Sequence, residues 1–281
     1  MKKRVISALL GSVLMIFGIW KADTMIFACV MAIACGLSGY EVTRVTGIEC
    51  KMMKAFSALF GASVPLVLYF DLKISGVKIY VPLIFVYLII MTALLLKNNQ
   101  KVKFHQFAVG AFGTVFFSYC LSLIVLIGDA KKFISPSFNY IEGVYLTVFA
   151  FCISWLTDAF AYFVGSKFGK HRLCKNISPK KSVEGAVAGF ILSIILNIII
   201  YAVFKKVSSY FVNIPLSFVV IMSGILAALS MVGDLFASLI KRNFSAKDFG
   251  NVLPGHGGAL DRFDSCVFVF PVLYFGLKFI V

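Results

Sequence analysis

Residues 104–127 read FHQFAVGAFGTVFFSYCLSLIVLI, a run of 24 residues that contains no Asp, Glu, Lys or Arg. A helix needs about 20 consecutive apolar residues to cross the hydrocarbon layer of a bilayer. Backbone amides must be paired within lipid, and the run lacks the alternation of polar and apolar residues that a barrel strand shows. The stretch therefore predicts a membrane-spanning helix.

The composition extends this conclusion to the whole chain of 281 residues. Hydrophobic residues make up 60% of it, charged residues only 14%, and the mean hydropathy is +0.97. Soluble globular domains, disordered tails and disulfide-stapled secreted modules need a larger polar fraction, so these classes are excluded. We predict an all-α integral membrane protein, a polytopic bundle of about nine transmembrane helices at residues 5–20, 24–40, 55–70, 78–96, 104–127, 143–165, 186–204, 214–240 and 265–281.

The distribution of Lys and Arg orients this predicted bundle. The N-terminus and alternate loops after it carry 19 of the 27 Lys and Arg residues, and the opposite side carries 8. Positive charge is retained in the cytoplasm during insertion, so we expect a cytoplasmic N-terminus. The net charge of +15 thus mostly reflects topology. Two cytoplasmic loops, between the sixth and seventh spans and between the eighth and ninth, hold ten of the nineteen charges and are where we expect function.

Cysteine spacing and chain organisation indicate no further functional site. The seven cysteines are scattered and form no C-x-x-C pair, so neither a disulfide framework nor a zinc site is expected. We expect no signal-peptide cleavage, because a second apolar run follows the first at once. The chain is interpreted as a single membrane domain, 1–281, with N-terminal spans in 1–140 that carry no candidate site residues and catalytic spans in 141–281.

Two predicted spans contain carboxylates. Asp158 lies in the sixth span and is expected to face the bundle interior, with a metal, a substrate hydroxyl or Lys167 as its partner. The end of the eighth span carries polar residues spaced at 0, 4, 7 and 8, which is one helical face: Asp234, Ser238, Lys241 and Arg242. The alternative to a functional site is an Asp neutralised by a neighbouring span, with the two cations reaching the surface.

The loop after the eighth span is rich in glycine and charge. His256, Gly257 and Gly258 belong to a stretch in which backbone N–H groups could approach an anion closely. Asp261 and Asp264 are one turn apart and suit either a hard cation or a helix N-terminus. A plain turn is the alternative. It explains poorly why the same loop also holds Lys247, Asp248 and Arg262.

The other charged loop precedes the seventh span. We predict Ser178 as the N-cap and Pro179 as the first residue of that helix, which would direct the positive end of the helix dipole at the loop. Lys180 and Lys181 would then supply compact positive charges for phosphate oxygens. The alternative is a positive-inside loop beside anionic lipid.

Together these residues resemble the phosphatidate cytidylyltransferases, also called CDP-diacylglycerol synthases. The run from Ser238 to Asp264 looks like the C-terminal signature of that family, and residues 158–162 and 178–185 are similar to two further blocks. The resemblance covers about residues 150–265. Ala259 departs from the larger aliphatic residue usual in the family, which should loosen packing without removing a reacting group.

The resemblance implies transfer of a cytidylyl group from CTP to phosphatidic acid with Mg2+ as cofactor, in a one- or two-metal centre. It implies Asp234 and Asp261 as metal ligands. Nucleotidyl transfer brings two anionic groups together, so it needs cations at the site. The expected catalytic residues are Asp234, Asp261 and Lys181, and the expected substrate contacts are Ser178, Lys180, Lys241, Arg242, Lys247, Asp248, His256, Gly257, Gly258, Arg262, Asp264 and Asp158.

The expected setting is a bacterial cell (inner) membrane, with the site facing the cytoplasm, no nucleic-acid partner, and a homodimer as one possible assembly.

Two other functional classes compete with the cytidylyltransferase interpretation. A transporter or channel with an ion path through Asp158 and Asp234 predicts inverted repeats with paired broken spans, which the sequence does not show. A CDP-alcohol phosphotransferase would carry an Asp-Gly-x-x-Ala-Arg motif, which this chain lacks.

Overall fold

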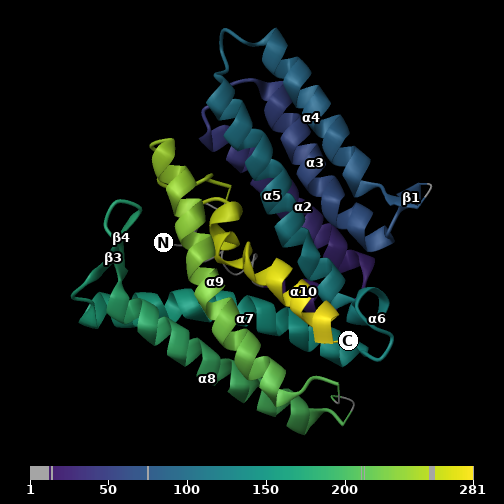
Figure 1. Ribbon diagram of the computed structural model, residues 1–281, viewed down its shortest axis with the longest axis vertical. Helices are drawn as coiled ribbons and strands as arrows, with labels where there is room; N and C mark the ends of the chain where they lie inside the picture. The colour runs from purple at the N-terminus through teal and green to yellow at the C-terminus, as the bar shows by residue number, and fades with distance from the viewer. Residues whose placement is uncertain are drawn as a thin grey trace. The chain divides into compact units, whose positions relative to one another are not determined.

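The computed structural model describes residues 13, 15–74, 76–209, 211, 213–252 and 257–280 (Figure 1). Within these residues, seven helices are long and apolar enough to cross a membrane: α2 (Met25–Val45), α3 (Lys51–Phe70), α4 (Tyr80–Lys97), α5 (Phe104–Gly128), α7 (Tyr140–Phe168), α8 (Val183–Val207) and α9 (Leu216–Asn243). The chain is therefore an all-α polytopic membrane protein, and the predicted fold class is confirmed.

Two of the nine expected spans are not among these seven helices. The first, 5–20, lies mostly outside the described residues. The ninth, 265–281, contains α10 (Val269–Ile280), a helix of 12 residues that follows the short 3-10 helices η1 (Leu260–Arg262) and η2 (Asp264–Cys266). Twelve helical residues extend about 18 Å, less than the hydrocarbon layer of about 30 Å. Residues 264–267 are buried in tight turns instead of extending the helix, so a full-length ninth span is not observed.

The chain divides into two compact units. The first unit comprises the residues up to 125 together with 243–263, and the second comprises 126–242 and 264–281. The glycine-rich loop after α9 thus belongs to the first unit, whereas the loop between α7 and α8 belongs to the second.

In the first unit, α2 packs along α3, and α3 packs against α4. A Cβ added at Gly39 would lie 3.1 Å from the carbonyl carbon of Ser57, so α2 and α3 are in backbone contact there. Ser57 and Tyr87 join α3 to α4 through a hydrogen bond of 2.9 Å. Between α3 and α4, β1 (Lys73–Ile74) and β2 (Val77–Lys78) form a short antiparallel hairpin.

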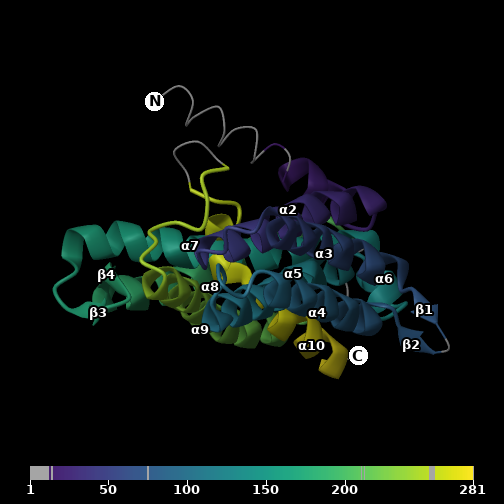
Figure 2. The ribbon, with the colours of Figure 1, turned by 90° about the horizontal axis from the view of Figure 1, so that it is seen from above.

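In the second unit, α6 (Ala130–Phe133) precedes α7, which packs against α8 (Figure 1). A capping box begins α7, because Asn139 Oδ1 accepts from the Glu142 N–H and Glu142 Oε2 accepts from the Asn139 N–H. At the other end of α7, β3 (Arg172–Cys174) and β4 (Ser178–Ser182) form an antiparallel hairpin before α8 begins (Figure 2).

This hairpin corrects the predicted start of the helix after α7. Ser178 is not the N-cap, since it begins β4 and pairs with Cys174. Ser182 caps α8 instead and accepts a hydrogen bond of 3.2 Å from the Gly185 N–H. Proline is tolerated in β4 because a two-stranded sheet has only edge strands. Lys180 and Lys181 therefore lie on an extended strand before the helix and not in its first turn.

Candidate active site

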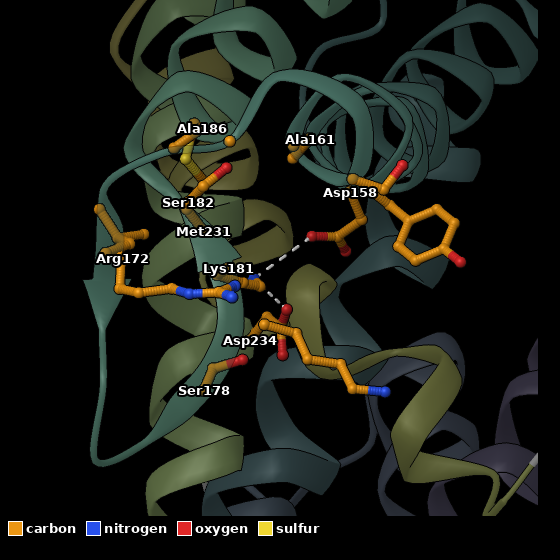
Figure 3. A pocket seen from close by; sticks show the side chains of 15 residues that line it. Asp158, Ala161, Arg172, Ser178, Lys181, Ser182, Ala186, Met231 and Asp234 are labelled. Carbon is orange, nitrogen blue, oxygen red and sulfur yellow. Dashed lines mark ion pairs between the residues drawn. The ribbon is translucent and has the colours of Figure 1, made fainter.

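A cavity of about 580 Å³ lies in the second unit, bounded by the end of α7, the β3–β4 hairpin, the start of α8 and the middle of α9. Figure 3 shows side chains from all of these elements directed into it. The charged loop between the predicted sixth and seventh spans thus folds over the end of the α7–α8 pair and forms a pocket there.

Close packing of α7 and α8 sets the shape of this pocket. A Cβ added at Gly185 would lie 2.5 Å from the carbonyl oxygen of Ala161, and one at Gly189 would lie 2.5 Å from that of Thr157. Any larger residue at either position would push the helices apart. The two glycines therefore allow the short approach that brings the hairpin over Asp158.

Three charged side chains from three elements meet in the pocket. Lys181 on β4 forms an ion pair with Asp234 on α9, and its Nζ lies 3.8 Å from Oδ1 of Asp158 on α7 (Figure 3). Burial lowers the pKa of Lys181, but the carboxylates of Asp234 and Asp158 outweigh this effect and raise its pKa above the ordinary 10.5. The ammonium group is therefore charged throughout the neutral pH range.

This geometry excludes Lys167, one of the three partners considered for Asp158. Lys167 follows Asp158 by nine positions, which is two and a half helical turns, so the two side chains lie on opposite faces of α7. Lys167 is exposed, and Lys181 from the hairpin is the lysine that faces Asp158.

Further polar residues line the pocket around this centre. Ser178, Lys180 and Arg172 all contribute to its wall, and Arg172 is not among the substrate contacts expected from the sequence. Its neighbours Lys170 and His171 made that loop conspicuously basic, but sequence spacing gave no reason to select Arg172 among them. Arg242 donates a hydrogen bond of 3.3 Å from Nε to the carbonyl oxygen of Ile177, which ties the hairpin to α9.

The predicted polar face of α9 divides into two groups. Ser238 donates a hydrogen bond of 3.3 Å to Oδ1 of Asp234 and so belongs to the charged centre of the pocket. Lys241 is buried and lies 3.5 Å from Oδ2 of Asp264. Asp234 thus pairs with Lys181, and Lys241 lies near Asp264, so each of these two charges on α9 has an opposite charge nearby, as desolvated ions require.

The glycine-rich loop of the first unit is organised by Asp261. Oδ2 of Asp261 accepts hydrogen bonds of 2.9 Å from the N–H groups of Phe249 and Gly258. Gly257 has a φ of 84°, in the left-handed region that favours glycine. Lys247, Asp248 and Arg262 are exposed. His256 lies outside the described residues.

Comparison with known proteins identifies the family. The model of the cytidylyltransferase family matches residues 2–280. The chain belongs to this family. Three similar proteins are each named phosphatidate cytidylyltransferase. The relative from Staphylococcus saprophyticus subsp. saprophyticus is 42% identical over 156 residues, and the one from Staphylococcus aureus is 40% identical over 159 residues; each match covers 56% of this chain and 57% of the relative. The relative from Bacillus subtilis is 33% identical over 198 residues, which cover 70% of this chain and 67% of the relative. The matches thus span between 57% and 67% of the length of these curated relatives.

For a cytidylyltransferase family member, the donors in the pocket fit a magnesium ion. Asp158 and Asp234 both present carboxylate oxygens to the Lys181 ammonium, which shows that this position suits a cation, and Oδ1 of Asp158 accepts no hydrogen bond from the described residues. The described part of the chain contains no group of three or more His, Cys, Asp and Glu residues that could by itself hold a metal ion. Magnesium commonly takes only one or two carboxylates and completes its shell with water and substrate phosphates.

Proposed function

We propose that the chain transfers a cytidylyl group from CTP to phosphatidic acid, forming CDP-diacylglycerol and pyrophosphate. The observation that carries this proposal is the pocket in which Lys181 meets Asp158 and Asp234, with Arg172 and Lys180 in its wall. Cations and carboxylates side by side at the end of a helix pair suit a site for phosphates and a metal ion. Membership of the cytidylyltransferase family and the names of the relatives support it.

The chemistry requires charge neutralisation more than proton transfer. An oxygen of the lipid phosphate attacks the α-phosphorus of CTP, a new P–O bond forms, and the bond to pyrophosphate breaks. A phosphate monoester is largely ionised at neutral pH, so the nucleophile needs no strong base. The side chains of Lys181, Lys180 and Arg172 would hold phosphate oxygens and offset the charge of the reacting groups.

Magnesium is the proposed cofactor, and the family resemblance names Asp234 and Asp261 as its ligands. When bound, the ion would neutralise charge on the phosphates and orient them. CTP, phosphatidic acid and the bilayer are the proposed partners. A homodimer and the lack of a nucleic-acid partner stay predictions from the sequence.

The direct test is pyrophosphate release by the purified, full-length protein. We expect release only when CTP, phosphatidic acid and magnesium are all present, with CDP-diacylglycerol formed in equal amount. Release without phosphatidic acid would identify a nucleotide hydrolase. The absence of release, with CDP-diacylglycerol consumed on addition of an alcohol, would identify a phosphotransferase.

We also propose that the pocket faces the cytoplasm of a bacterial cell. Lys131 and Asn176 are exposed near opposite ends of α7, whose 29 residues extend about 44 Å. In a variant without native cysteines, Lys131→Cys should react with an impermeant maleimide added to intact cells, whereas Asn176→Cys should react only after permeabilisation. Labelling of both in permeabilised cells is the control. The reverse pattern in intact cells would place the pocket outside.

A further inference from the structure

Glu41, in α2 of the first unit, is a fully buried carboxylate that the pocket does not use. It lies one residue beyond the predicted span 24–40 and is not among the site residues expected from the sequence. A lone carboxylate within an apolar span is nevertheless a functional hypothesis by default, because burying a charge costs several kcal/mol unless it is paired or hydrogen-bonded. What Glu41 contacts therefore indicates its role.

Both oxygens of Glu41 accept hydrogen bonds from the segment 257–262. Oε1 accepts from the N–H of Ala259, and Oε2 accepts from the N–H of Leu260, each at 2.9 Å. Ala259 is the N-cap of η1 and Leu260 is its first residue, and the first N–H groups of a helical turn have no partner within the turn. Glu41 thus caps a turn that lies 218 residues away along the chain.

Two glycines of the loop make room for this carboxylate. A Cβ added at Gly250 or at Gly258 would lie 2.6 Å from Cδ of Glu41, closer than van der Waals contact allows. The backbone of the loop therefore encloses the Glu41 side chain from two positions. Asp261 holds the same loop through the N–H groups of Phe249 and Gly258. Glu41 and Asp261 together hold the backbone at Phe249 and at residues 258–260.

We propose that Glu41 is a positioning residue that fixes the backbone of residues 257–262 and thereby places Asp261 and Arg262 for the reaction. The catalytic part of this proposal rests on the function proposed above, whereas the structural part does not. None of the residues that line the pocket lies in this segment. Loss of Glu41 should therefore lower kcat more than it raises the KM for CTP.

Glu41→Gln is the first test, because one face of the amide is an N–H donor and would meet a backbone N–H donor. In full-length protein in nanodiscs, amide hydrogen exchange of residues 257–262 should accelerate about tenfold or more, while peptides from α8 keep their protection. Per folded protein, kcat should fall about tenfold, and the KM for CTP should stay within about threefold. The exposed Glu49, in the loop after α2, supplies the matched control Glu49→Gln, which should leave both readouts unchanged.

Unchanged exchange in Glu41→Gln, or faster exchange with unchanged kcat, would overturn the positioning role. Inactive wild-type protein would instead refute the proposed function, and the exchange experiment would still decide whether Glu41 fixes the loop.

A double-mutant cycle provides an independent readout in case Glu41→Gln does not fold. Gly250→Ala alone should lower kcat about tenfold or more, because its Cβ displaces the carboxylate. In the background of Glu41→Asp, whose carboxylate is one methylene shorter, the same Gly250→Ala change should cost about threefold or less. Equal costs in the two backgrounds would show that Gly250 does not act through Glu41 and would contradict the proposal.

Discussion

Replacement of Asp234 by asparagine should lower turnover about 100-fold or more, because it removes one of the two carboxylates that face Lys181 and a proposed metal ligand. The amide keeps the size of the side chain and can still accept the hydrogen bond from Ser238. The protein should therefore insert and purify normally. The measurement is kcat of purified protein in saturating magnesium, CTP and phosphatidic acid.

A charge-matched control separates this effect from a general loss of negative charge. Asp71 forms ion pairs with Lys73 and Lys78 beside the β1–β2 hairpin, at 2.8 Å and 3.5 Å. Exposed pairs of this kind contribute about 0 to 1 kcal/mol, so Asp71→Asn should leave kcat within about twofold. Near-normal activity of Asp234→Asn would remove Asp234 from the metal site and leave it only the role of pairing with Lys181.

The helical framework could be predicted from the sequence because its signal is local. Seven of the nine predicted spans correspond to observed helices, which begin and end within about five residues of the predicted bounds. The ninth run failed because hydropathy does not distinguish a helix from buried 3-10 turns. The β3–β4 hairpin was missed for a related reason, since Ser178 and Ser182 are equally good capping residues and a polar five-residue strand shows no alternation.

The candidate site could be predicted only in part, because its contacts join distant segments. Asp158, Lys181 and Asp234 were each selected as chemically unusual, yet nothing in their spacing showed that they meet. The helical period alone excludes Lys167 as the partner of Asp158, and this test was available from the sequence. Glu41 lies one residue beyond the predicted span 24–40, and its partners lie more than 200 residues away, so its neighbours in the sequence do not indicate its role.

Lys181 provides the second large effect, and Lys181→Met should lower kcat about 100-fold. The change removes the cation between Asp158 and Asp234 and leaves two carboxylates facing each other in a partly buried site. Lys206, exposed at the opposite end of α8, provides the matched control, and Lys206→Met should remain within about twofold of wild type. Initial rates at varied CTP for the three proteins, normalised to folded protein, are the measurement.

Lys181→Arg separates a positioned phosphate contact from a charge that only sets topology. Arginine keeps the charge, so a topological role predicts wild-type kinetics. In the structure, however, one compact ammonium group faces two carboxylates from different helices. The planar guanidinium favours a two-pronged pair with one carboxylate and is bulkier than the ammonium it replaces. We therefore expect Lys181→Arg to lose about tenfold in kcat/KM, or about 1.4 kcal/mol of transition-state stabilisation. Wild-type kinetics for Lys181→Arg would assign this lysine to topology and leave Arg172 and Lys180 as the phosphate contacts of the pocket.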